Sequence, residues 1–324
     1  MFALLSADEG GRPARIWQKR MIQGLLLVLA LLVTAAVGEW AARREIDRQS
    51  DAIHRTLDLQ VSALRGKVGQ YANIPYTAAQ HSDVQALLLQ PSPERIQRVN
   101  VYLQEVSRRI GADALYLMDG AGLTLAASNW NSTASFIGQK YDFRPYFKDA
   151  IAGTNGFFYA IGATTGEPGL FISTPVRIAG QPVGVVAVKV GLQEVEESWR
   201  KAGTPVLLTD ERGIVFLSSL FSWTYKATRT LSPSELSWVL DHAQYGSNTA
   251  FPRLPWEVQH NPGEPGFVST SAFEDRPHEY LMLSEPLTEF GWTLTVLSDY
   301  SPVRYARWIA WAMVLLLLLA VTSA

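Results

Sequence analysis

The chain contains no cysteine among its 324 residues, and it has only five histidines. Without cysteine it has no disulfide bond, no thiolate nucleophile and no cysteine-ligated zinc site, and it is compatible with an oxidising compartment. The GxSxG motif of serine hydrolases is also missing. No pair of histidines has the spacing of metal ligands. We therefore expect no catalytic residues, metal or cofactor in these residues; the histidines are His54, His81, His242, His260 and His278.

A strong charge of either sign is also missing. The formal net charge is −2, and 48% of the residues are hydrophobic. Neither a basic nucleic-acid-binding chain nor a disordered tail has this composition. We expect a folded protein with no nucleic-acid partner, whose compartment is indicated by its hydrophobic segments.

The first hydrophobic segment covers residues 21–37 (MIQGLLLVLALLVTAAV). It is about long enough to cross a bilayer, which needs roughly 17 to 25 apolar residues. Basic residues precede it, which favours a cytoplasmic N-terminus. Glu39 and Trp40 stand where a cleaved signal peptide would have small residues. We predict a cytoplasmic segment at 1–20 and an uncleaved transmembrane helix at 21–38.

The second hydrophobic segment covers residues 308–320 (WIAWAMVLLLLLA). Tyrosines and tryptophans precede and open it, as expected where a helix enters a membrane interface. We predict a transmembrane helix at 303–324, with residues 39–302 in the periplasm of a bacterial inner membrane. Because the sequence stops at Ala324, we expect either a piece of a longer receptor or an output on another chain.

A long helix is predicted for residues 39–74, because apolar residues recur in steps of three, four and seven. This stripe either packs against its own domain or forms the seam of a homodimer through the N-terminal helix, and the sequence does not separate the two. A second helix is predicted from Pro93 to Ile110. The stripe consists of Ile46, Ile53, Leu57, Val61, Leu64 and Val68.

The region between the hydrophobic segments contains an internal repeat. Residues 115–128 (LYLMDGAGLTLAAS) match residues 207–219 (LLTDERGIVFLSS), each with an Asp-x-x-Gly turn between two apolar strands. Further matches join GEPG and the following strand at 166–174 to GEPG and its strand at 263–271, and 182–190 to 290–297. Three matches in one order predict a duplicated α+β module. We expect a membrane-distal module at 75–200 and a membrane-proximal module at 201–302.

Two cations distinguish the first copy from the second. The first copy has Arg144 within the aromatic sequence YDFRPYF, and Lys189 within its last strand; the second has Val296 opposite Lys189 and no matching arginine. Lys189 is either a solvated edge-strand residue or points into a pocket. Arg144 either makes a structural cation-π contact or ion pair with Asp142 or Asp149, or holds an anion.

Together the two cations favour a small dicarboxylate ligand. An arginine holds one carboxylate through two hydrogen bonds, and a lysine offers a point charge to the other. An α-amino acid ligand would need a carboxylate near its ammonium group, and no acid occupies the strand position of Lys189. The hydroxyl candidates are Tyr141, Tyr146, Thr164, Thr165 and Ser173, with Ser128 and Asn129 as weaker ones.

The segments FRPYF, GATTGEPGLFIST and GVVAVKV resemble the periplasmic double Cache (tandem PAS-like) sensor region of the four-carbon dicarboxylate sensor histidine kinases, the DctB type. The resemblance covers nearly the whole chain. It implies that Arg144 and Lys189 bind the carboxylates of succinate, fumarate or malate, with Tyr141, Tyr146, Thr165 and Ser173 around them. It also implies an α+β fold of two antiparallel-sheet modules, and a dimer.

The chain departs from that family in lacking a phosphoacceptor helix and an ATP-binding domain after the second hydrophobic segment. We therefore interpret it as the input half of a two-component sensor kinase. Two alternatives stay open: a similar receptor with a chemotaxis or cyclic-dinucleotide output, and a membrane adaptor that binds no ligand.

Overall fold

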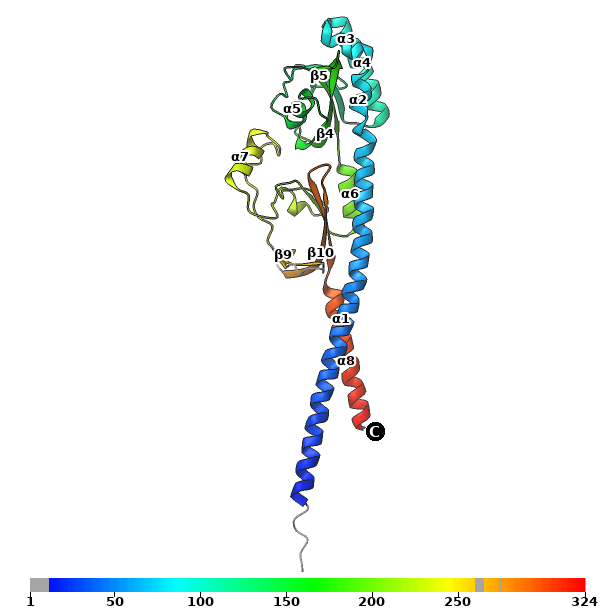
Figure 1. The fold of residues 1–324 in the computed structure, drawn as a ribbon, viewed down its shortest axis with the longest axis vertical. Helices are drawn as coiled ribbons and strands as arrows, with labels where there is room; N and C mark the ends of the chain where they lie inside the picture. The colour runs from blue at the N-terminus through cyan, green and yellow to red at the C-terminus, as the bar shows by residue number, and fades with distance from the viewer. Residues whose placement is uncertain (1–11, 260–264, 274–275, 324) are drawn as a thin grey trace, which may run out of the picture.

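A computed structural model of the chain describes residues 12–259, 265–273 and 276–323 (Figure 1). The predicted α+β fold is confirmed: one long N-terminal helix runs beside two antiparallel sheets, and an apolar helix follows them. The helices are α1 (Arg12–Ala72), α2 (Ile74–Ala79), α3 (Ser82–Leu89), α4 (Pro93–Ile110), α5 (Pro145–Ile151), α6 (Gln193–Ala202), α7 (Pro233–Asp241) and α8 (Ser301–Ser323), with a short 3₁₀ turn at Phe221–Trp223.

Both sheets are antiparallel throughout. The strand order of the first sheet is β2-β1-β5-β4-β3, and that of the second is β7-β6-β11-β10-β9-β8. The strands of the first are β1 (Ala114–Asp119), β2 (Thr124–Ala127), β3 (Gly156–Ile161), β4 (Pro168–Ile178) and β5 (Gln181–Val190). Those of the second are β6 (Val206–Thr209), β7 (Val215–Ser218), β8 (Trp256–Gln259), β9 (Gly266–Phe273), β10 (Arg276–Leu287) and β11 (Trp292–Asp299).

The apolar stripe of α1 packs inside its own chain. Leu57, Val61, Leu64 and Val68 are each at most 3% exposed and belong to one core with residues of both sheets. Figure 1 shows α1 running along one side of both sheets, while α5 and α7 lie on the other side. Of the two interpretations of the stripe, packing on its own domain is correct. The stripe is therefore not available as a dimer seam.

Two of the three repeat matches are confirmed by the turns and strands. Asp119 Oδ1 accepts the backbone N–H groups of Ala121 and Leu123, both at 2.9 Å. Asp210 Oδ1 accepts those of Arg212 and Ile214, also at 2.9 Å. The strand β5 of the first copy and β11 of the second likewise occupy the same place in their sheets. The Asp-x-x-Gly signal works because one carboxylate oxygen closes the turn.

The match between the two GEPG segments is wrong in topology. In the first copy the strand after GEPG is β4, which pairs with β5. In the second it is β9, which stands one strand further from β11, in the place of β3. Gly263 and Glu264 themselves lie outside the described residues. A four-residue turn motif recurs easily, because it reports turn geometry and not strand order.

The count that placed Val296 opposite Lys189 is wrong by one residue. Leu115 pairs with Val188, and its equivalent Val206 pairs with Val296. Leu297 therefore takes the register of Lys189 and faces the same side of its sheet. The contrast between the copies still holds, because an apolar residue replaces the lysine.

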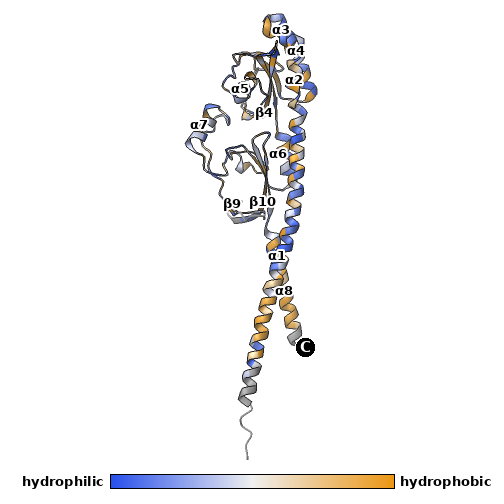
Figure 2. Cartoon of the chain, in the orientation of Figure 1, coloured by the Kyte–Doolittle hydropathy of each residue, from blue (hydrophilic) through white to orange (hydrophobic). Residues whose placement is uncertain are grey.

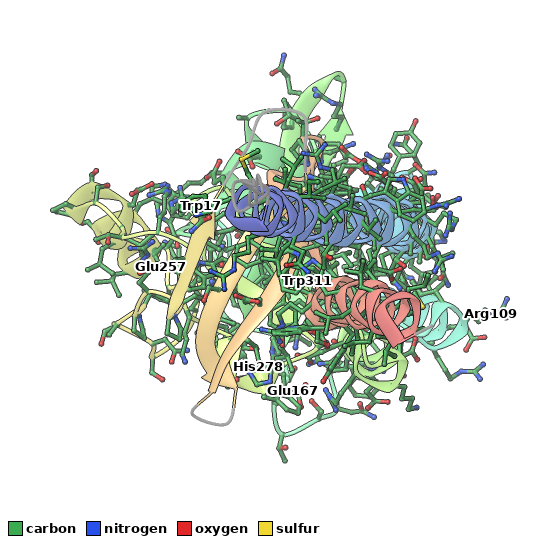
Figure 3. All side chains as sticks on the ribbon, turned by 90° about the horizontal axis from the view of Figure 1, so that it is seen from below. Trp17, Arg109, Glu167, Glu257, His278 and Trp311 are labelled. Atoms are coloured by element: carbon green, nitrogen blue, oxygen red, sulfur yellow. The ribbon has the colours of Figure 1, made fainter. Side chains whose placement is uncertain are left out.

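Within the part of the chain that the structure describes, two helices are long and apolar enough to cross a membrane, by length and composition. Figure 2 shows apolar residues concentrated in the lower part of α1 and in α8. The helices touch at Gly38, where an added Cβ would lie 1.8 Å from Trp311 Nε1, and Figure 3 shows Trp311 between them. Glycine therefore permits the close approach of α8 to α1.

Candidate functional site

Lys189 lies in the middle of the first sheet and not at its edge. Its strand β5 is paired with β1 on one side and β4 on the other. The side chain is only 1% exposed. The interpretation of Lys189 as a solvated edge-strand residue is therefore wrong, because the cation is buried in the middle of a sheet among valines and an alanine of its own strand.

The Lys189 ammonium has one hydroxyl and two carboxylates around it. Nζ donates to Thr165 Oγ1 at 3.1 Å and lies 3.8 Å from Glu167 Oε2 and 3.9 Å from Asp113 Oδ2. Burial lowers the pKa of Lys189, and the two carboxylates oppose this effect. An acid near Lys189 was not expected from the sequence, because Asp113 and Glu167 lie outside its strand. The exclusion of an α-amino acid ligand on that ground is therefore wrong.

Gly169 makes room for the lysine stem. A Cβ on Gly169 would lie 2.9 Å from Lys189 Cε and 3.1 Å from its Cγ. A Cβ on Gly162 would instead lie 2.6 Å from Thr165 Oγ1, and its distance of 3.6 Å from Lys189 Nζ is an ordinary contact. The GATTGEPG segment therefore has a second role besides forming a turn: its last glycine lets a long cation lie across the neighbouring strand.

Arg144 is held by backbone carbonyls. Nη1 donates to the carbonyls of His242 at 3.1 Å and Ala243 at 3.0 Å, and Nη2 donates to that of Ile161 at 2.8 Å. The side chain is 2% exposed, and its guanidinium lies 5.1 Å from the ring of Phe143. Burial lowers the pKa of Arg144.

Of the structural alternatives for Arg144, the ion pair with Asp142 or Asp149 does not form. Asp142 is paired with Lys140 at 3.0 Å. Arg144 directly precedes α5 with an extended backbone, and its side chain donates to carbonyls of the second module. The other alternative, a cation-π contact, is present with Phe143.

Tyrosines close the space beside Arg144. The hydroxyls of Tyr141 and Thr164 are 2.6 Å apart, and Tyr116 donates to the hydroxyl of Tyr146 at 2.8 Å. Burial raises the pKa of Tyr116 and Tyr146, so both phenols stay protonated at neutral pH. The small cavity that remains has a volume of about 10 Å³, and its lining residues are Phe136, Tyr141, Arg144, Tyr146, Gly162, Ala163, Thr164 and Phe171.

The two cations converge on one peptide bond. Arg144 Nη2 bonds the carbonyl of Ile161, and Lys189 Nζ lies beside the next residue, Gly162. Bond lengths then limit the distance between Nη2 and Nζ to about 11 Å at most. Sequence patterns indicated that each cation was unusual, but this shared peptide lies in neither motif.

Four of the seven residues proposed from the sequence line the cavity: Tyr141, Arg144, Tyr146 and Thr164. Lys189 and Thr165 do not line the cavity; they lie next to Gly162, where Lys189 Nζ donates a hydrogen bond to Thr165 Oγ1. Ser173 instead donates to the backbone carbonyl of Tyr146 at 2.7 Å and so holds α5 in place. Phe136, Gly162, Ala163 and Phe171 also line the cavity and were missed, because nothing in an apolar strand or loop sets a lining residue apart from a core residue.

The two weaker candidates are structural. Ser128 Oγ accepts the backbone N–H of Leu115 at 2.9 Å. The amide of Asn129 bridges the backbone of Ala134 and Phe136. Among the described residues there is also no group of three or more acidic or histidine side chains placed to hold a metal ion.

Comparison with known proteins gives relatives along nearly the whole chain. It is 30% identical over 291 residues to the C4-dicarboxylate transport sensor protein DctB of Rhizobium meliloti, covering 89% of this chain and 46% of the relative. It is 31% identical over 305 residues to the DctB protein of Pseudomonas aeruginosa, covering 92% and 47%. The chain thus spans about half the length of these relatives. No protein-family model matches it.

Solved structures show the same fold. The crystal structure of the V. cholerae histidine kinase DctB sensor domain has a TM-score of 0.72 and 30% identity, covering 79% of this chain and 98% of that one. The ligand-binding domain of the Pseudomonas fluorescens chemoreceptor CtaA with L-leucine has a TM-score of 0.53 at 17% identity, covering 81% and 98%, and shares the fold alone. From its identity over nearly all of a solved sensor domain, the chain belongs to the DctB family of sensor proteins and contains the sensor domain of that family.

Proposed function

We propose that the membrane-distal module binds a small dicarboxylate such as succinate, fumarate or malate between Arg144 and Lys189. The observation that carries this proposal is the pair of buried cations on one face of the first sheet, at most about 11 Å apart. An extended four-carbon dicarboxylate spans about that distance when each end makes a charge-assisted hydrogen bond of about 2.8 Å. The DctB relatives are C4-dicarboxylate sensor proteins by name.

Arg144 keeps donors for a ligand. Its guanidinium has five N–H groups. Three of them serve the carbonyls of Ile161, His242 and Ala243 in the described part of the chain. The two other donors are Nε–H and one N–H of Nη2. A carboxylate bound in the bidentate mode accepts two such hydrogen bonds. The carbonyls thus fix the guanidinium, and the remaining donors are available for an anion.

Ligand entry requires the site to open. A cavity of about 10 Å³ holds roughly one water molecule and is too small for a dicarboxylate. The hydrogen bond between the hydroxyls of Tyr141 and Thr164 joins the residues just before α5 to the β3–β4 loop across this cavity. We propose that the loop at 162–167 moves outward, so that Thr164 and Thr165 exchange their present partners for the ligand.

The signalling part of the proposal concerns the two predicted membrane helices. We propose that residues 21–38 and 303–324 cross the inner membrane and place the two modules in the periplasm, which agrees with the apolar surfaces of α1 and α8. Ligand binding would then shift the packing of α8 on α1 and bias a cytoplasmic kinase output. Such a coupling typically needs about 1 to 3 kcal/mol.

A homodimer along α1 is proposed on a different face from the buried stripe. Leu59 is 66% exposed on the side away from both sheets. Because the chain has no cysteine, a Leu59→Cys variant provides one reactive site. Oxidation of membranes that contain it is expected to give a disulfide-linked dimer, whereas Arg109→Cys, exposed on α4, is expected to give none. Equal yields from both variants would contradict a dimer along this face.

The test of the ligand is calorimetric titration of the full chain in lipid nanodiscs with succinate, fumarate and malate. Lys189→Met keeps roughly the length of the side chain and removes its charge. Arg144→Lys keeps the positive charge but removes the planar guanidinium that makes two parallel hydrogen bonds. Both are expected to weaken binding by about 30-fold or more. Lys148→Met, an exposed position on α5, is the matched control and is expected to bind as the wild type does.

Two results would contradict the proposal. The first is the absence of heat with all three dicarboxylates in a wild-type chain shown to be folded by circular dichroism. The second is unchanged affinity in both cation variants. L-Leucine is titrated in parallel, because the carboxylates of Asp113 and Glu167 beside Lys189 would suit an ammonium group. Binding of leucine but not succinate would replace the dicarboxylate with an α-amino acid.

A further inference from the structure

The ligand site is completed by the other module. Two of the three carbonyls that hold Arg144 belong to His242 and Ala243, 98 and 99 residues further along the chain. They directly follow α7, which ends at Asp241 in the membrane-proximal half. The carbonyls at a helix C-terminus carry partial negative charge and lack partners within the helix. A buried guanidinium is a suitable partner for them.

The segment after α7 is also bonded to the edge of the first sheet. The backbone N–H of Ile161 on β3 donates to the carbonyl of Gln244 at 2.9 Å. The side-chain amide of Gln244 donates to the carbonyl of Tyr159 at 3.4 Å. We call residues 242–246 the α7 turn. It covers the end of β3 at Ile161, whose carbonyl accepts from Arg144.

A ring contact adds to this attachment. Trp238 of α7 lies against Phe158 of β3, with ring centroids 6.3 Å apart. Phe158 in turn lies 6.0 Å below the guanidinium of Arg144. The α7 helix therefore touches the environment of the arginine through its side chains as well as through its last carbonyls.

The α7 turn is equally well attached to its own module. Tyr245 donates to Asp210 Oδ2 at 3.0 Å, while Asp210 Oδ1 closes the turn between β6 and β7. Arg212 of that turn lies 3.6 Å over the ring of Trp238. These contacts connect the α7 turn to the end of β6, the strand next to β11, which leads into α8.

We infer that the α7 turn is a positioning element of the ligand site, and that ligand binding and the attachment of this turn stabilise each other. The inference rests on the proposed function, because it concerns the same arginine. The carbonyls of His242 and Ala243 fix two donors of the guanidinium and that of Ile161 fixes a third, which leaves two of the five for the ligand. A carboxylate bound there holds the guanidinium still, which in turn favours the carbonyl contacts. Linkage of this kind is reciprocal.

The first test is hydrogen exchange of the wild-type chain in nanodiscs, with and without saturating succinate. The amides of Gln244 and Gly246 donate within the α7 segment, to Val239 and Ala243. We expect slower exchange across residues 233–246 when succinate is bound, and no change in the Lys189→Met variant. Succinate binding by the wild type with unchanged exchange at 233–246 would overturn the inference and leave the dicarboxylate site intact. No binding at all would contradict the proposed function itself.

The second test is a pair of substitutions on α7. Trp238→Ala removes the ring contact with Phe158, while Leu240→Ala on the exposed side of the same helix is the control. We expect Trp238→Ala to weaken succinate binding by about 5-fold or more, within the range of typical couplings, and Leu240→Ala to leave it unchanged. Equal affinities in the wild type and Trp238→Ala, with faster exchange at 242–246 in the variant, would show that the turn does not position the arginine.

Discussion

Replacement of Lys189 by methionine is expected to weaken ligand binding strongly without a matching loss of stability. The ammonium is 1% exposed and has one hydrogen bond, to Thr165, while its two carboxylate neighbours at 3.8 and 3.9 Å lie beyond hydrogen-bond range. A buried charge with so little compensation is costly to the folded state. Methionine fills a similar volume without that cost. We expect the free energy of unfolding to stay within about 1 kcal/mol of the wild type or to rise.

The same substitution is expected to weaken ligand binding strongly. Removal of one partner from a buried, hydrogen-bonded charge pair costs about 2 to 5 kcal/mol, which corresponds to roughly 30-fold to several-thousand-fold in Kd. Thermal unfolding followed by circular dichroism gives the stability, and calorimetric titration with succinate gives the affinity. A variant that is destabilised by more than about 3 kcal/mol would refute the reasoning, because Lys189 would then be a structural residue. A stable variant with wild-type affinity would remove Lys189 from the site.

Three further predictions concern the same module. Burial lowers the pKa of Lys189, so between the folded and unfolded pKa values the unfolded state binds more protons than the folded state. The wild type should therefore gain stability relative to Lys189→Met as the pH rises from 7 toward 10.5. The measurement is the difference in Tm between the two chains. A difference that stays constant with pH would contradict it. Gly169→Ala places a Cβ 2.9 Å from Lys189 Cε, so we expect a cost of about 1 to 3 kcal/mol in unfolding free energy and weaker succinate binding by titration; unchanged affinity would show that the lysine has room to shift. Ser128→Ala leaves the buried N–H of Leu115 without the hydroxyl, so denaturant unfolding should show a loss of about 1 to 3 kcal/mol, while binding by the folded chain stays the same; a lost affinity at full stability would restore Ser128 as a ligand residue.

Much of the architecture was accessible from sequence, because it depends on local patterns. Helical spacing predicted the stripe of α1, and Pro93 marked the start of α4, where the structure also begins that helix. The Asp-x-x-Gly turns were recognisable because the carboxylate of Asp119 or Asp210 bonds amides two and four residues away. The GEPG match failed for the opposite reason: strand order depends on pairing between distant segments, which a turn motif does not encode.

The residues alone predicted a pair of functional cations, since Arg144 among aromatic residues and Lys189 in an apolar strand have no counterpart in the second module. Their surroundings depend on how distant segments pack. Asp113 and Glu167 come to Lys189 from outside its strand, and the carbonyls of His242 and Ala243 come to Arg144 from the other module. Contacts between residues nearly a hundred positions apart follow from how sheets and helices pack, and sequence periodicity reports only which face of an element is buried.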